Sequence, residues 1–323
     1  MEIIKPGVSI DFMRYRAIGA ALSGLIVLVS VILIAVKGFN YGIGFAGGVE
    51  LRVEFKEKVS IGDVRRRLID GGFKNVQVVS FLLENRTVYS IKAKGESSVT
   101  EALAGETEKS QESELPDVAR VLMAQLQKDY GADRVEVIST DMVGPRVGES
   151  LRRKGVMAIV YALLGILVYI GWRFNFRYSP GAVVALAHDV IVVAGVFALL
   201  QLEIDLTVVA ALLTVAGYSV NDTVIIFDRV REGHTVYRGK PIITIVNNSL
   251  NDTLSRTILT SGTTLIVVLA IYFLGSEIIK DFALAMSVGI LVGTYSSLYI
   301  ATPIYIALEE ISIKRRRLAR KKS

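Results

Sequence analysis

Five polar side chains stand within or beside long apolar stretches of this 323-residue sequence: His188, Asp189, Asn221, Asp222 and Arg256. A charge at the centre of a membrane helix costs about 2.5–3.5 kcal/mol on insertion scales, so each one needs a partner or a role. A carboxylate and a guanidinium at similar depth can form a protonation switch, because neutralising the acid releases the base. We therefore take Asp222 and Arg256 as the candidate proton pathway. Asn221, Asp189 and His188 are lower-ranked candidates for the same pathway or for packing.

Each of these residues also has a purely structural interpretation. Arg256 can extend toward water or pair with Asp252 one helical turn earlier. Asp222 can be a neutral packing residue that hydrogen-bonds to polar neighbours on its own helix. His188 and Asp189 are adjacent and point about 100° apart on a helix, so we expect no tight local dyad between them.

The composition excludes most other chemistries. Cys is absent and His occurs only at positions 188 and 234, so we expect no metal site, no cofactor and no enzyme. His234 stands in a polar stretch and is expected to be solvated. Asp189 and Asp222 lack the glycine-flanked motif of an intramembrane aspartyl protease. The GxGxxG pattern at residues 42–47 follows an apolar span and precedes a strand, so it predicts a tight junction and no dinucleotide site.

The elements that must position these residues are membrane helices. With 52% apolar and 21% charged residues and a mean hydropathy of +0.49, the chain is too apolar for an ordinary soluble domain. A spanning helix needs about 20 mostly apolar residues. Six stretches qualify, at residues 17–36, 155–172, 180–200, 206–227, 258–274 and 282–308. The first is expected to be an uncleaved signal anchor, since no small-residue cleavage site follows it.

Basic residues gather in the short connections on one side of these spans, which predicts that both termini are cytoplasmic. Residues 1–16 then form the N-terminus, 37–154 an extracytoplasmic domain, 228–257 a cytoplasmic loop within the 155–308 region, and 309–323 a basic tail. The tail is interpreted as a topology anchor, and no nucleic acid is expected as a partner. From Pro241, apolar residues at helical spacing predict an interfacial helix that leads into the fifth span and holds Arg256.

Residues 37–154 are predicted to form one α/β domain. Residues 48–56 alternate apolar and charged side chains, as in a half-buried strand. A helix at 60–69, strands at 74–83 and 86–94 around a turn at 84–85, a helix at 115–130 and a strand at 134–139 follow. This β-α-β-β-α-β order is the ferredoxin-like arrangement. Residues 95–114, rich in Glu, Ser, Gly and Thr, are interpreted as a flexible insertion.

The motifs resemble those of the SecF family of protein-export membrane proteins, which are relatives of the proton-driven RND transporters. The resemblance rests on residues 39–48, 143–148, 187–190, 217–229, 255–257 and 260–261. The family usually has Asp at the position of Gly44, so no role of that carboxylate is carried over to this chain.

The resemblance implies an α-helical membrane protein: an RND-like half of six transmembrane helices with one exported ferredoxin-like domain. It implies SecD, the SecYEG translocon, YajC, YidC and the translocating preprotein as partners in the bacterial inner membrane. Proton flow would help draw secretory proteins across, with Asp222 and Arg256 matching the family's proton-pathway residues. Two other functions stay open, a non-energised scaffold of the translocon and an RND-like exporter of small molecules or lipids.

Overall fold

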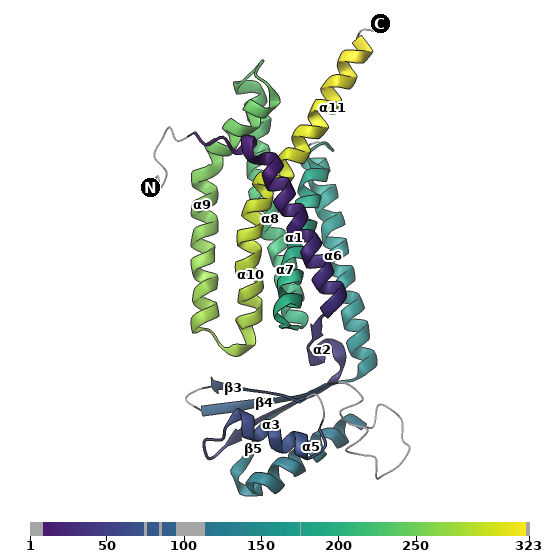
Figure 1. The fold of residues 1–323 in the computed structure, drawn as a ribbon, viewed down its shortest axis with the longest axis vertical. Coiled ribbons are helices and arrows are strands. Elements are labelled where there is room, and N and C mark those ends of the chain that lie inside the picture. Colours follow the sequence, from purple (N-terminus) through teal and green to yellow (C-terminus); the bar gives the residue numbers. More distant parts are fainter. Residues whose placement is uncertain (1–8, 74–75, 84–85, 95–113, 175, 321–323) are drawn as a thin grey trace.

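The computed structural model describes residues 9–73, 76–83, 86–94, 114–174 and 176–320. A bundle of long helices stands on a small sheet domain, and the beginning of α1 and the end of α11 lie toward the end of the bundle away from that domain (Figure 1). We call the two ends of the bundle the sheet side and the terminal side. The predicted turn at 84–85 and all but the last residue of the predicted insertion 95–114 lie outside the described residues.

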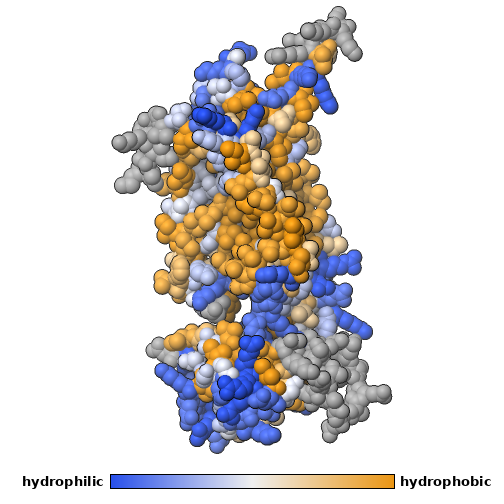
Figure 2. All heavy atoms as spheres, in the orientation of Figure 1, coloured by the Kyte–Doolittle hydropathy of each residue, from blue (hydrophilic) through white to orange (hydrophobic). Residues whose placement is uncertain are grey.

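Long apolar helices build the bundle. They are α1 (Arg16–Lys37), α6 (Pro145–Arg173), α7 (Ser179–Leu200), α8 (Leu206–Val236), α9 (Ile242–Leu274) and α10 (Glu277–Ser296), which continues through a π-helix (Ser297–Ala301) into α11 (Thr302–Arg320). Within the described ranges these helices supply six candidate membrane spans. Hydrophobic residues cover the middle of the bundle, and hydrophilic residues gather at the sheet domain and toward the terminal side (Figure 2). The predicted six-span membrane architecture is therefore confirmed.

The predicted loop at 228–257 is almost entirely helical. Helix α8 runs on to Val236, and α9 begins at Ile242, so only residues 237–241 connect them. The predicted interfacial helix is thus the first part of α9. Ile242, Val246 and Leu250 on this part are buried in an apolar cluster of the bundle, which explains why the helix continues beyond the apolar span.

The sheet domain has the predicted ferredoxin-like order. Its elements are β2 (Gly48–Phe55), α3 (Ile61–Asp70), β3 (Val76–Leu83), β4 (Arg86–Lys94), α5 (Glu114–Tyr130) and β5 (Val135–Val143). The strands pair antiparallel in the order β3-β4-β2-β5, and α3 and α5 cover one face over a core that includes Val53, Ile91 and Leu122. Strand β5 is longer than the predicted 134–139, because pairing with β2 holds its polar end in the sheet.

The predicted junction at residues 42–47 is confirmed as a close crossing of backbones. Strand β1 (Asn40–Tyr41) pairs in parallel with β6 (Glu203–Ile204), and the short helix α2 (Ile43–Ala46) follows. Gly47 and Gly48 have φ of 77° and 141°, values that side-chain-bearing residues rarely adopt. A Cβ on Gly148 would lie 2.8 Å from the carbonyl oxygen of Phe45. Only glycines therefore allow the chain to leave and re-enter the bundle here.

Candidate functional site: two buried carboxylates in the helix bundle

Asp222 lies where α8 meets α9 and α10, and its side chain is almost fully buried, with 1% exposure. Its Oδ2 accepts a hydrogen bond from Ser261 Oγ of α9 at 3.2 Å. Thr294 of α10 donates in turn to Ser261 Oγ at 3.0 Å. The other oxygen, Oδ1, has no hydrogen-bond partner within the part of the chain that the structure describes. Asp222 is therefore an incompletely paired carboxyl group inside an apolar bundle, which is a costly arrangement without a proton or a further partner.

Arg256 stands on the exposed surface of α9, five residues before Ser261, and thus about 7–8 Å nearer the terminal side. It lines a cavity there together with Ile225, Asp228, Arg229, Glu232, Asp252 and Thr253. Asp222 and Arg256 are not in ion-pair contact among the described residues, although Arg256 lies close enough for a Coulombic interaction. Arg256 is thus an exposed cationic side chain on the terminal side of the buried acid.

The predicted alternative in which Arg256 pairs with Asp252 is wrong. Asp252 instead accepts from the guanidinium of Arg229, with 2.8 Å between Oδ2 and Nη2. Arg229 belongs to α8, so this pair joins α8 to α9 across the cavity. Because Asp252 already pairs with Arg229 on the neighbouring helix, Asp252 is not the ion-pair partner of Arg256.

Asp189 on α7 is fully buried and has three partners. Its Oδ2 accepts from Ser219 Oγ of α8 at 2.6 Å and from Ser296 Oγ at the end of α10 at 2.9 Å. Its Oδ1 lies 3.0 Å from Nδ1 of His188. The expectation of no local dyad between His188 and Asp189 is therefore wrong. Side-chain torsions bring the carboxylate and the ring together despite the 100° between their Cα–Cβ directions.

The two carboxylates differ in their hydrogen bonding. Both oxygens of Asp189 are occupied, and its partners hold α7, α8 and α10 together, which fits the packing role that the sequence left open. His188 is 5% exposed, and its Nε2 has no partner among the described residues. Asp222 has one hydrogen-bond partner and one oxygen without a partner among the described residues, so it is held less completely than Asp189.

The polar neighbours of Asp222 on its own helix do not serve it. Asn221 is exposed, Ser219 donates to Asp189, and Thr223 shares a hydrogen bond of 2.8 Å with Ser297. The interpretation of Asp222 as hydrogen-bonded to these helical neighbours is therefore wrong. Consecutive residues of a helix point in different directions, so its partner comes from α9.

The sequence analysis did not predict the Ser and Thr residues that surround the two carboxylates. They are chiefly Ser261, Thr294 and Ser296. Each is a small polar residue in an apolar span, which is a common and weak signal. His234, expected to be solvated, lies 2.8 Å from the hydroxyl of Tyr305 through its Nε2. No three His, Asp or Glu side chains come together as metal ligands within the described ranges.

Comparisons with known proteins identify the family. Residues 123–311 match the family described as protein export membrane protein SecD/SecF, C-terminal, and residues 32–59 match the SecD/SecF GG motif. Protein translocase subunit SecF of Desulfurispirillum indicum is 40% identical over 300 residues, covering 92% of this chain and 91% of the relative. Protein translocase subunit SecF of Rhodothermus marinus is 38% identical over 314 residues, covering 95% and 96%.

A solved structure agrees with these matches. The crystal structure of SecDF, a translocon-associated membrane protein from Thermus thermophilus, superposes with a TM-score of 0.76 at 35% identity over 94% of this chain. The match covers 39% of that longer chain, so this chain spans about two fifths of the solved protein. By family match, sequence identity and fold, the chain belongs to the SecD/SecF family of protein translocase subunits.

Proposed function

We propose that this chain is the SecF-type half of a SecD–SecF assembly that uses the proton motive force to promote secretory-protein translocation beside the SecYEG channel. In this proposal the chain is not an enzyme: it makes and breaks no covalent bonds. The SecDF relatives support SecD as the companion, because in them a region like this chain is fused to a longer remainder. Positive charge in the connections on the terminal side supports both termini being cytoplasmic and the sheet domain lying outside.

The proposal rests on Asp222 Oδ1, which is buried and has no hydrogen-bond partner among the described residues. Asp222 stands one helical turn before Ile225, which lines the same cavity as Arg256. A proton that enters through the cavity and binds Asp222 removes the charge that attracts Arg256, and the packing of α8 against α9 then changes. One elementary charge that crosses 100 mV releases about 2.3 kcal/mol. That energy is of the size needed to shift a two-state arrangement of helices by tens of fold.

Export measured in membrane vesicles with and without a proton gradient tests this proposal. We expect Asp222→Asn to remove the gradient-dependent part of export, because an amide can accept the hydrogen bond from Ser261 but cannot take up and release a proton. Arg256→Ala is expected to act in the same direction. Glu310→Gln is the control, since Glu310 is an exposed acid of α11 that does not line this cavity.

Gradient-dependent export that stays at the wild-type level in Asp222→Asn would contradict the proton pathway. Loss of export that follows only loss of assembly would favour the scaffold function. Gradient-driven transport of a small solute by the purified assembly, without SecYEG, would favour the exporter function.

A further inference from the structure

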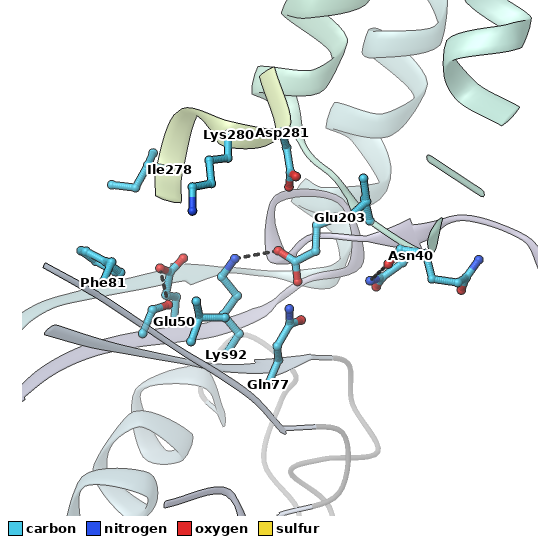
Figure 3. A pocket seen from close by; sticks show the side chains of 13 residues that line it. Asn40, Glu50, Gln77, Phe81, Lys92, Glu203, Ile278, Lys280 and Asp281 are labelled. Carbon is cyan, nitrogen blue, oxygen red and sulfur yellow. Dashed lines mark hydrogen bonds and ion pairs between the residues drawn. The ribbon is translucent and has the colours of Figure 1, made fainter. Parts of the chain in front are cut away.

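A group of paired charges lies between the sheet domain and the bundle, away from both buried carboxylates. Glu203 of β6 stands in the connection from α7 to α8, and it reaches toward two lysines of β4. Lys92 Nζ lies 2.6 Å from its Oε2, and Lys94 Nζ lies 2.5 Å from its Oε1. Figure 3 shows Lys92 and Glu203 facing each other across the gap between strand and connection. We call Glu203, Lys92 and Lys94 the junction clamp.

Backbone and amide contacts surround the junction clamp. Asn40 of β1 accepts a hydrogen bond from Lys94 at 3.0 Å and donates one to the carbonyl oxygen of Gln201 at 2.9 Å. Two residues after Glu203, Asp205 caps the first turn of α8 by accepting from the backbone N–H of Val208 at 2.9 Å. Glu203 therefore stands in a short connection whose contacts reach the end of α7 and the first turn of α8. These two helices carry Asp189 and Asp222.

The clamp residues are largely withdrawn from solvent. The exposed fractions of the side chains are 11% for Glu203, 21% for Lys92 and 16% for Lys94. Ion pairs at this depth are less screened than surface pairs, and removing one partner leaves a buried charge without compensation. A tight pair in this place resists separation of β4 from β6.

Glu203 and Lys92 stay charged over a wide pH range. Burial by itself would raise the pKa of Glu203, but hydrogen bonds from Lys92 and Lys94 bring that pKa below its ordinary value. Burial opposes the charge of Lys92, yet Glu203 raises the pKa of Lys92 above its ordinary value. The ion pair between Glu203 and Lys92 therefore weakens only as pH falls below the usual pKa range of Glu or rises above that of Lys. Glu50, Asp205, Lys280 and Asp281 lie around it.

We infer that the junction clamp is the mechanical joint that transmits displacement of α7 and α8 to the sheet domain. This inference rests on the proposed function, since it assigns the route by which a proton-driven movement in the bundle reaches the outer domain. The covalent connections at residues 38–48 and 143–145 hold the domain near the bundle. The clamp couples it to the one connection between the two helices that contain the buried carboxylates.

Distance measurements by electron paramagnetic resonance test the joint directly. Because the sequence lacks Cys, spin labels at Asp70→Cys on α3 and Leu274→Cys at the end of α9 are the only thiol labels in the full chain in nanodiscs. We expect Glu203→Gln to broaden and shift the distance distribution between the labels. Glu57→Gln is the matched control, since Glu57 pairs with Arg134 on the exposed surface of the sheet domain.

Charge reversal provides the second variant. The triple change Lys92→Glu, Lys94→Glu and Glu203→Lys restores opposite charges on the two sides, so it is expected to recover much of the narrow distribution. A distribution that Glu203→Gln leaves unchanged would overturn the joint, whatever happens to export. If Glu203→Gln broadens the distances and slows gradient-dependent export, while Asp222→Asn leaves export normal, the joint stands and the proton pathway fails.

Discussion

Replacing Asp189 with Ala is expected to lower the free energy of unfolding of the bundle by about 2–5 kcal/mol, since each of three intramembrane hydrogen bonds contributes about 0.6–2 kcal/mol. The change leaves Ser219, Ser296 and His188 without their common acceptor, at a point where α7, α8 and α10 meet. It also leaves a void in a closely packed interior, which adds to the loss. Thermal unfolding of the purified chain in detergent, followed by size-exclusion chromatography, measures the effect.

The contrast with Asp222 makes this prediction specific. Asp222→Ala leaves a similar void but removes only one hydrogen bond, and Asp222→Asn retains an acceptor for Ser261, so both are expected to unfold at a higher temperature than Asp189→Ala. Ser296→Ala should fall between the two, because Asp189 keeps its other partners. If Asp189→Ala and Asp222→Ala lowered the unfolding temperature equally, the assignment of a packing role to one and a protonation role to the other would be wrong.

Replacing Gly48 with Ala is expected to destabilise the sheet domain by about 2–6 kcal/mol, the sum of backbone strain of about 1–3 kcal/mol and overpacking of a similar size. The φ of Gly48 is 141°, and an added Cβ would meet the backbone carbonyl oxygen of Ala93 in the neighbouring strand β4. Rotation of a side chain can relieve neither the backbone strain nor the contact with the carbonyl oxygen. Hydrogen–deuterium exchange measures the effect, and we expect the backbone amides of β2, β4 and β5 to exchange faster.

Gly44 provides the matched control for that substitution. It lies in α2 of the same junction, its φ is not positive, and a Cβ there would meet nothing within 4 Å. Gly44→Ala is therefore expected to leave exchange unchanged or to slow it slightly. Equal exchange in the Gly48 and Gly44 variants would show that the strained junction does not control the stability of the sheet.

Features with a regular period could be predicted from the sequence. The alternation of Val49, Leu51 and Val53 with charged residues predicted β2, and its inward-facing side chains are buried as expected. Long apolar runs likewise predicted the six candidate spans. Burial in lipid or protein requires apolar residues at regular positions, and this regularity is visible in the sequence. The extension of β5 to Val143 has no such pattern and depends on pairing with β2.

Features that depend on tertiary packing could not be predicted. Asp222 was identified because a carboxyl group in an apolar run is conspicuous, yet its partner Ser261 is 39 residues away on another helix. Arg256 could be predicted to lie at the start of the fifth span, but no local rule shows that Asp252 pairs with Arg229. Glu203 could not be singled out, because it is one acidic residue in a short connection and belongs to no motif. Its importance comes from Lys92 and Lys94, more than 100 positions earlier.

The π-helix at Ser297–Ala301 sets the register of the last span. A π-turn holds one residue more than an α-turn, so its conversion to α-helix would rotate α11 by about 100° and shift it by about 1.5 Å against α10. Such a rotation would carry Glu309 away from Arg177 and Tyr305 away from His234. The extra residue next to Asp189 therefore fixes which face of α11 meets the rest of the bundle on the terminal side.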